Sequence, residues 1–178
     1  MNESELPDPV VPLHAEVDRE TRRLHVLHAA RLQCKRGCSS CCVDELTVFA
    51  VEADHIRRHH EDLLAAGAPH AEGACAFLDE EGACRIYAER PYVCRTQGLP
   101  LRWIAEDEEE QEEGQRRPVE LRDICPLNET GETIELLRAE DCWTIGPIEE
   151  RLAGLQFATA IPSGRVRLRA LFAPKERP

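Results

Sequence analysis

The sequence is poor in the large side chains that fill most protein cores. Only 4% of its 178 residues are aromatic, and it has a single Met. No stretch approaches the ~20 apolar residues that a membrane-spanning helix needs. The first residues, MNESELPDPVVPL, are acidic and broken by three prolines, unlike the basic and apolar segments of a secretory signal. We therefore expect a cytoplasmic protein without membrane contact, stabilised by something besides a large apolar core.

Basic side chains are also in the minority. Lys and Arg number 22 against 34 Asp and Glu, which gives a formal net charge of -12. Such a surface repels a phosphate backbone, so we expect no nucleic-acid partner. Much of the acidity lies in residues 106–113, EDEEEQEE, and we predict a solvated acidic loop over residues 106–117.

Several motifs of common enzyme classes are missing. The sequence contains neither G-x-G-x-x-G nor G-x-x-x-x-G-K, so it has no recognisable phosphate-binding loop. It also lacks the G-x-S-x-G of many hydrolases. No segment reads as a nucleotide fold for S-adenosylmethionine. These absences leave open whether the protein is an enzyme.

Cysteine, by contrast, is abundant. The chain has nine, and four of them lie in residues 34–42, CKRGCSSCC. In a reducing compartment such a cluster is more often metal-binding or catalytic than disulfide-bonded. Cys41 and Cys42 are adjacent, and a disulfide between them would be strained. The odd number of cysteines also favours free or metal-bound thiols.

The spacing of the cysteines predicts a two-part metal site. Short C-x2-3-C loops let two thiolates reach one soft ion with little loss of chain entropy, while other ligands arrive from a second segment. The predicted ligands are Cys34, Cys38, Cys41, Cys42, Cys75, Cys84 and Cys94. Seven thiols exceed the four of one tetrahedral ion. The site is therefore either a single centre with spare thiols or a multinuclear one with bridging thiolates.

Arginines close to these cysteines fit an anionic metal site. Arg85 and Arg95 directly follow cysteines, and Arg90 lies between them. Guanidinium groups there can hydrogen-bond sulfur and offset the excess negative charge of clustered thiolates. The alternative is that the three arginines are ion-pair partners of surface carboxylates.

Hydrophobic periodicity and turn signals predict a small α+β protein. Residues 1–11 are expected to form a flexible lead-in, and residues 12–178 a single domain with a metal core over about residues 34–98. Helices are predicted over residues 12–33, 51–66 and 147–158, with a short one from Pro91 that carries Cys94. Strands are predicted over residues 45–49, 99–104 and 119–124, a hairpin over 75–87, and an edge strand or docked arm over 165–172.

The histidines are weaker candidates for ligands. His55 and His59 are four residues apart on a predicted helix, but two arginines separate them, so we interpret them as part of a solvated face. His60 is expected at the edge of the core. His25 and His28 precede the cysteine loop and are only minor candidates for approaching it.

The cysteine pattern resembles a known family. The loop C-x3-C-x2-C-C at residues 34–42 and the block CRIYAERPYVCR at residues 84–95 are similar to the CxxCxxCC cysteine-cluster family, of the YkgJ type, described as a zinc- or iron-chelating domain and related to flagellin lysine N-methylases. The resemblance implies ligation by the same seven cysteines. It adds Cys125 as an eighth candidate ligand and Cys142 as a weaker one.

Three functional hypotheses follow from the cysteine cluster. In the first, bound zinc or iron mainly stabilises the fold. In the second, the protein is an enzyme with an iron–sulfur or thiolate–zinc centre that transfers a methyl group or an electron. In the third, the protein stores or delivers metal ions. We expect metal ions as partners, and the sequence does not indicate a protein partner.

Overall fold

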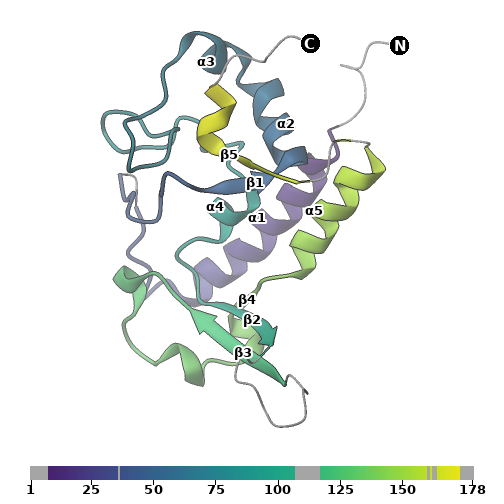
Figure 1. The fold of residues 1–178 in the computed structure, drawn as a ribbon. Helices are drawn as coiled ribbons and strands as arrows, with labels where there is room; N and C mark the ends of the chain where they lie inside the picture. The colour runs from purple at the N-terminus through teal and green to yellow at the C-terminus, as the bar shows by residue number, and fades with distance from the viewer. Residues whose placement is uncertain (1–7, 36, 107–116, 160, 162–163, 173–178) are drawn as a thin grey trace.

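Helices and two small sheets alternate along the chain, as expected for the α+β class (Figure 1). The computed structural model describes residues 8–35, 37–106, 117–159, 161 and 164–172. The helices are α1 (Val10–Leu27), α2 (Ala50–His59), α3 (Glu61–Ala66), α4 (Tyr92–Thr96) and α5 (Pro147–Ala158). The strands are β1 (Thr47–Phe49), β2 (Leu101–Glu106), β3 (Pro118–Asp123), β4 (Trp143–Thr144) and β5 (Arg165–Arg167).

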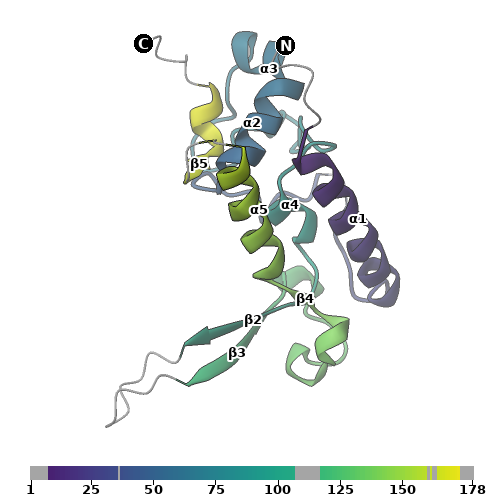
Figure 2. The same cartoon turned by 90° about the vertical axis from the view of Figure 1, so that its right-hand side faces the viewer.

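The two sheets have different surroundings. β1 and β5 pair antiparallel, with Val48 opposite Val166, and Val48 is fully buried. The other sheet has the order β3-β2-β4, in which β2 is antiparallel to β3 and parallel to β4. Figure 2 shows β2 and β3 projecting from the body of the molecule as a ribbon. Residues 107–116, which include most of the predicted acidic loop, lie outside the described residues.

Two clusters of buried apolar side chains hold the body together. The first joins α1, α4, α5 and β4, and includes Leu24, Tyr92 and Leu152. The second joins β1, α2 and the C-terminal segment to the cysteine-bearing chain around Phe77. α2 lies between them, because Val51 packs in the first cluster and Ile56 in the second.

The first helix differs from its predicted bounds. It begins at Val10, inside the expected lead-in, and ends at Leu27 rather than at residue 33. Leu27 is 49% exposed, whereas Leu32, beyond the end of the helix, still packs against the first cluster. After α1 the His28 ring bonds the carbonyl of Asp141, which anchors the turn that leads into the cysteine loop.

The helix predicted over residues 51–66 is broken in two. His60 leaves the helical conformation with φ -131°, and its ring bonds the carboxylate of Glu89. The position of His60 at the edge of the core is confirmed, since it is half-buried. The predicted stop at Gly67 is also confirmed.

Most other predicted elements are confirmed with shifted ends. α5 has the predicted bounds, and β1, β2 and β3 overlap the predicted strands. The hairpin over residues 75–87 is reduced to one β-bridge between Leu78 and Cys84 around an Asp79 turn. The edge strand near the C-terminus is limited to β5, because residues 168–172 form a 3-10 helix.

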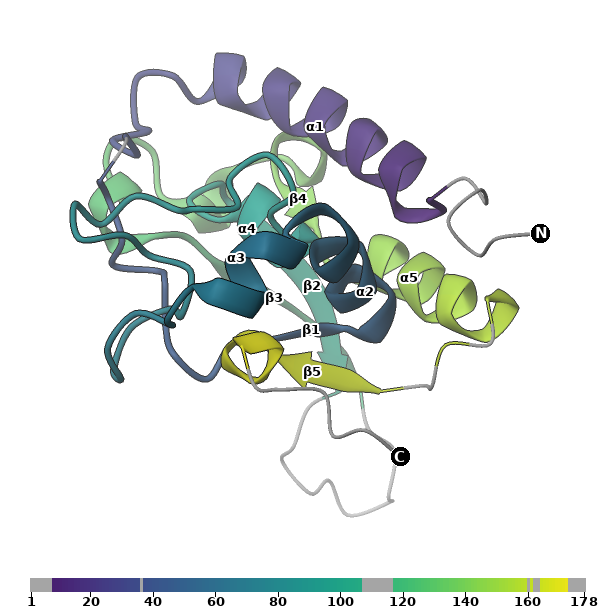
Figure 3. The same cartoon turned by 90° about the horizontal axis from the view of Figure 1, so that it is seen from above.

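The irregular segments gather on one side. Seen from above, the loops that follow α1, α3 and β3 lie on the side away from α5 (Figure 3). Across the described residues, no helix combines the length and apolar character needed to cross a membrane. The regular elements thus form a support on one side, and the cysteine-bearing loops lie on the other.

Truncating Leu152 on α5 should strongly destabilise the fold. Its side chain is fully buried in the first cluster, so Leu152→Ala should cost about 2–5 kcal/mol in the free energy of unfolding. Phe157 on the same helix is 92% exposed, and Phe157→Ala should change that free energy by less than about 0.5 kcal/mol. Denaturant unfolding of both variants tests this packing, and equal losses would contradict it.

Candidate metal centre

A cavity of about 850 Å³ lies among the irregular segments. Cysteines from four places in the chain line it: Cys34, Cys38, Cys41, Cys42, Cys75, Cys84 and Cys94. All nine cysteines of the chain are free thiols. Apolar side chains of the second cluster, including Phe77, Ile86 and Leu168, line the same cavity. The seven cysteines singled out in the sequence therefore share one cavity.

Tight turns position the first group of cysteines. The backbone N–H of Cys38 donates to the carbonyl of Lys35 at 2.9 Å, and that of Cys42 donates to Ser39 at 2.9 Å. Gly37 lies within the first of these turns and has φ 82°, a conformation that favours glycine. Two turns in succession bring sulfurs that are close in sequence to the same cavity.

Backbone hydrogen bonds join the second segment to the first. The N–H of Cys75 donates to the carbonyl of Cys42 at 2.9 Å, which ties residues 33 positions apart. Cys84 is aligned by its β-bridge to Leu78. The positions of these two cysteines relative to the loop are thus fixed by main-chain contacts.

The third part of the wall is α4, which carries Cys94. The N–H of Tyr92 donates to buried Glu52 at 2.6 Å, and the Tyr92 hydroxyl accepts a hydrogen bond from Trp143 Nε1 at 2.8 Å. Arg95 is 5% exposed and binds Asp18 of α1 at 2.7 Å. This short helix is therefore anchored to α1, α2 and β4.

The three predicted arginines bind oxygen in this structure. Arg90 and Arg95 line the cavity and pair with Asp18, while Arg85 donates to the carbonyls of Ala68 and Ala76. Among the described residues, none of the three donates to a cysteine sulfur. Their charge still acts on the thiols, because Arg90 and Arg85 oppose the effect of burial on the pKa of Cys84.

Asn128 makes a sulfur contact that the sequence argument did not single out. It is fully buried, and its Nδ2 donates to Cys34 Sγ at 3.2 Å and to the carbonyl of Gly98 at 2.7 Å. Its Oδ1 accepts from the N–H of Gln33 at 2.7 Å. Amide donors to sulfur orient and tune thiolate ligands. Because this contact spans 94 residues, little in the sequence indicates it. The one signal is that Asn128 lies three residues after Cys125.

The two downstream cysteines lie apart from this group. Neither Cys125 nor Cys142 is among the described residues that line the cavity. Cys142 is buried and lies 3.9 Å from an Arg122 nitrogen near the β2–β3 ribbon. Ligation by Cys125 as an eighth ligand thus gains no support from its position.

The adjacent thiols strongly affect each other. A hydrogen bond from the Cys42 thiol lowers the pKa of Cys41 to about 6. The same hydrogen bond, together with burial and the charges of neighbouring sulfurs, raises the pKa of Cys42. Burial raises the pKa of Cys94, as do the charges of Cys75 and Cys84. The cavity thus disfavours several thiolates at once unless a cation balances them.

The histidines differ in part from the sequence interpretation. His25 on α1 lines the cavity, whereas His28 is turned to the Asp141 carbonyl. His59 is exposed as expected. His55 is only 4% exposed, so its assignment to a solvated face was wrong. The reason is a partner 47 residues earlier, Asp8, whose carboxylate binds His55 Nδ1 at 2.7 Å.

Gly98 should be needed for the position of Cys34. A Cβ at Gly98 would lie 2.6 Å from Cys34 Sγ, and Gly98 has φ +90°. Gly73 has φ +94° but nothing within 4 Å of its Cβ position, which makes it a matched control. We expect Gly73→Ala to cost about 1 kcal/mol from backbone strain alone, and Gly98→Ala at least about 1 kcal/mol more from the clash. Equal losses in the free energy of unfolding would contradict this close contact.

Comparison with known proteins agrees with the geometry. Residues 33–126 match the family model CxxCxxCC, whose description reads "Putative zinc- or iron-chelating domain". The match extends past the predicted metal core and covers more than half of the chain, including all seven cavity cysteines. No curated protein and no solved structure matches the chain. The chain belongs to the CxxCxxCC family.

Proposed function

We propose that the cysteine cavity binds zinc or iron through thiolates and that the bound metal stabilises the fold. The observation that carries this proposal is that seven cysteines from separate segments line one cavity. The family description supports zinc or iron as the metal. Because the loops around the cavity contain little regular structure, metal–sulfur bonds would supply the cross-links that a larger apolar core provides elsewhere.

The number of cysteines favours more than one ion. A tetrahedral zinc ion takes about four thiolates, and the cavity offers seven. Thiolates that bridge two ions would use all seven and reduce the excess negative charge. We propose Cys34, Cys38, Cys41, Cys42, Cys75, Cys84 and Cys94 as the ligands. We assign Arg90 and Arg95 to charge compensation at the cavity wall, and we propose a cytoplasmic location, where thiols stay reduced.

An iron–sulfur centre for redox or methyl-transfer chemistry is the second candidate. The surplus of thiols favours it, because the cavity offers seven cysteines where one tetrahedral ion needs about four. Iron and acid-labile sulfide in stoichiometric amounts would select this candidate. Zinc without sulfide would select the structural role. Rapid metal exchange through the exposed Cys34 would instead indicate storage or delivery.

Replacing one cavity cysteine should remove metal, whereas replacing a cysteine elsewhere should not. Cys94→Ser removes a sulfur from the anchored helix α4, and we expect it to lose about half or more of the bound metal. Cys142→Ser is the control, because Cys142 is also buried but does not line the cavity. Metal per chain, measured by mass spectrometry after anaerobic purification, distinguishes them. Equal metal loss in both variants would contradict the assignment.

Removing the metal should unfold the cysteine-bearing part of the protein. When metal binding and folding are linked, the free energy of binding is also free energy of folding. We expect exhaustive chelation under reducing conditions to reduce the helical circular-dichroism signal and to abolish cooperative melting. Restoring zinc or iron should recover both. A metal-free protein that melts cooperatively at the original temperature would rule out the structural role.

A further inference from the structure

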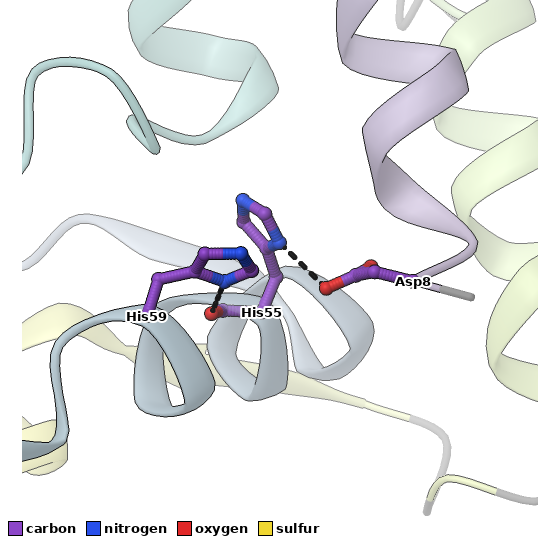
Figure 4. Close-up of side chains that lie close together, drawn as sticks. All are labelled: Asp8, His55 and His59. Atoms are coloured by element: carbon purple, nitrogen blue, oxygen red, sulfur yellow. Dashed lines mark hydrogen bonds and ion pairs between the residues drawn. The ribbon is translucent and has the colours of Figure 1, made fainter. Parts of the chain in front are cut away.

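A second group of metal-binding side chains lies outside the cysteine cavity. Asp8 lies two residues before the start of α1, while His55 and His59 are one turn apart on α2 (Figure 4). One ligand atom from each of the three lies within 4.8 Å of the other two. None of the three lines the cysteine cavity. The group therefore requires its own explanation.

The hydrogen bonds of His59 leave one ring nitrogen available. Its Nδ1 lies 2.9 Å from the carbonyl of His55, and a carbonyl only accepts, so Nδ1 carries the proton. In the neutral ring Nε2 then has a free lone pair. The His59 side chain is exposed, so an ion can reach this nitrogen from solvent. A backbone bond that fixes the tautomer is a common feature of metal-binding histidines.

His55 and Asp8 share a proton where a metal ion can replace it. His55 Nδ1 lies 2.7 Å from Asp8 Oδ2. Two ligands about 2.0–2.1 Å from one tetrahedral ion are about 3.3 Å apart, so a small opening of this pair makes room. The ion would form bonds to Nδ1 and to the carboxylate oxygen, and the displaced Nδ1 proton would pass to the buffer.

Charged and histidine side chains surround Asp8 and His55. Asp8 also pairs with Arg58 at 3.5 Å, but Arg58 is held more closely by Asp54 at 2.8 Å. Next to His55, at 5.5 Å between ring centroids, lies buried His14, which is bonded to Glu52. The Nδ1 of His14 has no hydrogen-bond partner among the described residues, so a further ring nitrogen without a partner lies next to His55.

We propose that Asp8, His55 and His59 bind one divalent transition-metal ion, with zinc as the reference ion. The ligand atoms are an Asp8 carboxylate oxygen, His55 Nδ1 and His59 Nε2. Two imidazoles and a carboxylate form a nitrogen–oxygen donor set, distinct from the thiolates of the cavity, and they leave a position for water. The ion would link Asp8, in the segment that leads into α1, to α2. This proposal does not depend on what the cysteines bind.

The test uses the full chain after its cysteines have been saturated with zinc. Further zinc is added while the histidine ring nitrogens are followed by 15N NMR and bound zinc is counted by equilibrium dialysis. We expect one more zinc per chain, with shifts at His55 and His59. Removing the exposed ligand in His59→Ala should weaken this binding by at least about tenfold. Asp8→Asn keeps the side-chain shape, removes the charge and should weaken it similarly.

One neighbouring variant serves as a control and a second as a further test. His60→Ala removes the next histidine, which is bonded to Glu89, and should leave the additional zinc in place. Arg58→Ala removes the cation that competes for Asp8, and should tighten zinc binding several-fold. Ring signals that stay unchanged up to millimolar zinc would overturn the proposal. An additional zinc that survives both His59→Ala and Asp8→Asn would also overturn it.

Discussion

The cost of ionising thiols that are buried in one cavity is the constraint on which the rest of this structure depends. Seven cysteines share one cavity, and burial raises the pKa of Cys75, Cys84 and Cys94. The hydrogen bond with Cys41, together with burial, raises the pKa of Cys42. A bound cation would offset that cost, because it attracts the ionised sulfurs. The chain has few aromatic residues and yet brings seven thiols together. Metal binding would explain this, because its free energy would offset the cost of ionising the thiols.

The regular elements serve mainly to support the cavity walls. Glu52 on α2 is buried and accepts hydrogen bonds from the backbone of α4 and from His14 on α1, so one carboxyl group connects three helices. Trp143 on β4 holds Tyr92 from another side. Asn128 donates hydrogen bonds to both Cys34 Sγ and the carbonyl of Gly98. These contacts position sulfurs through oxygen and nitrogen partners far away in sequence.

Local sequence patterns predicted the features that depend on neighbouring residues. Four cysteines in nine residues indicated the thiol-rich cavity, and Pro147 with its apolar stripe indicated α5 with its observed bounds. Features that depend on distant partners were missed. His55 is buried because Asp8 binds it, and Asn128 reaches Cys34 across 94 residues. α1 ends at Leu27, and the next residue, His28, is held by the carbonyl of Asp141, a distant partner that periodicity alone does not reveal.

The most direct test is anomalous diffraction from crystals of anaerobically purified protein, recorded at the zinc and iron absorption edges. We expect anomalous peaks inside the cysteine cavity, about 2.3 Å from sulfur atoms that include those of Cys41, Cys42, Cys75 and Cys94. The edge at which the peaks appear identifies the metal. A cavity without an anomalous peak, with its cysteines still free thiols, would contradict the claim that these thiols form a metal centre.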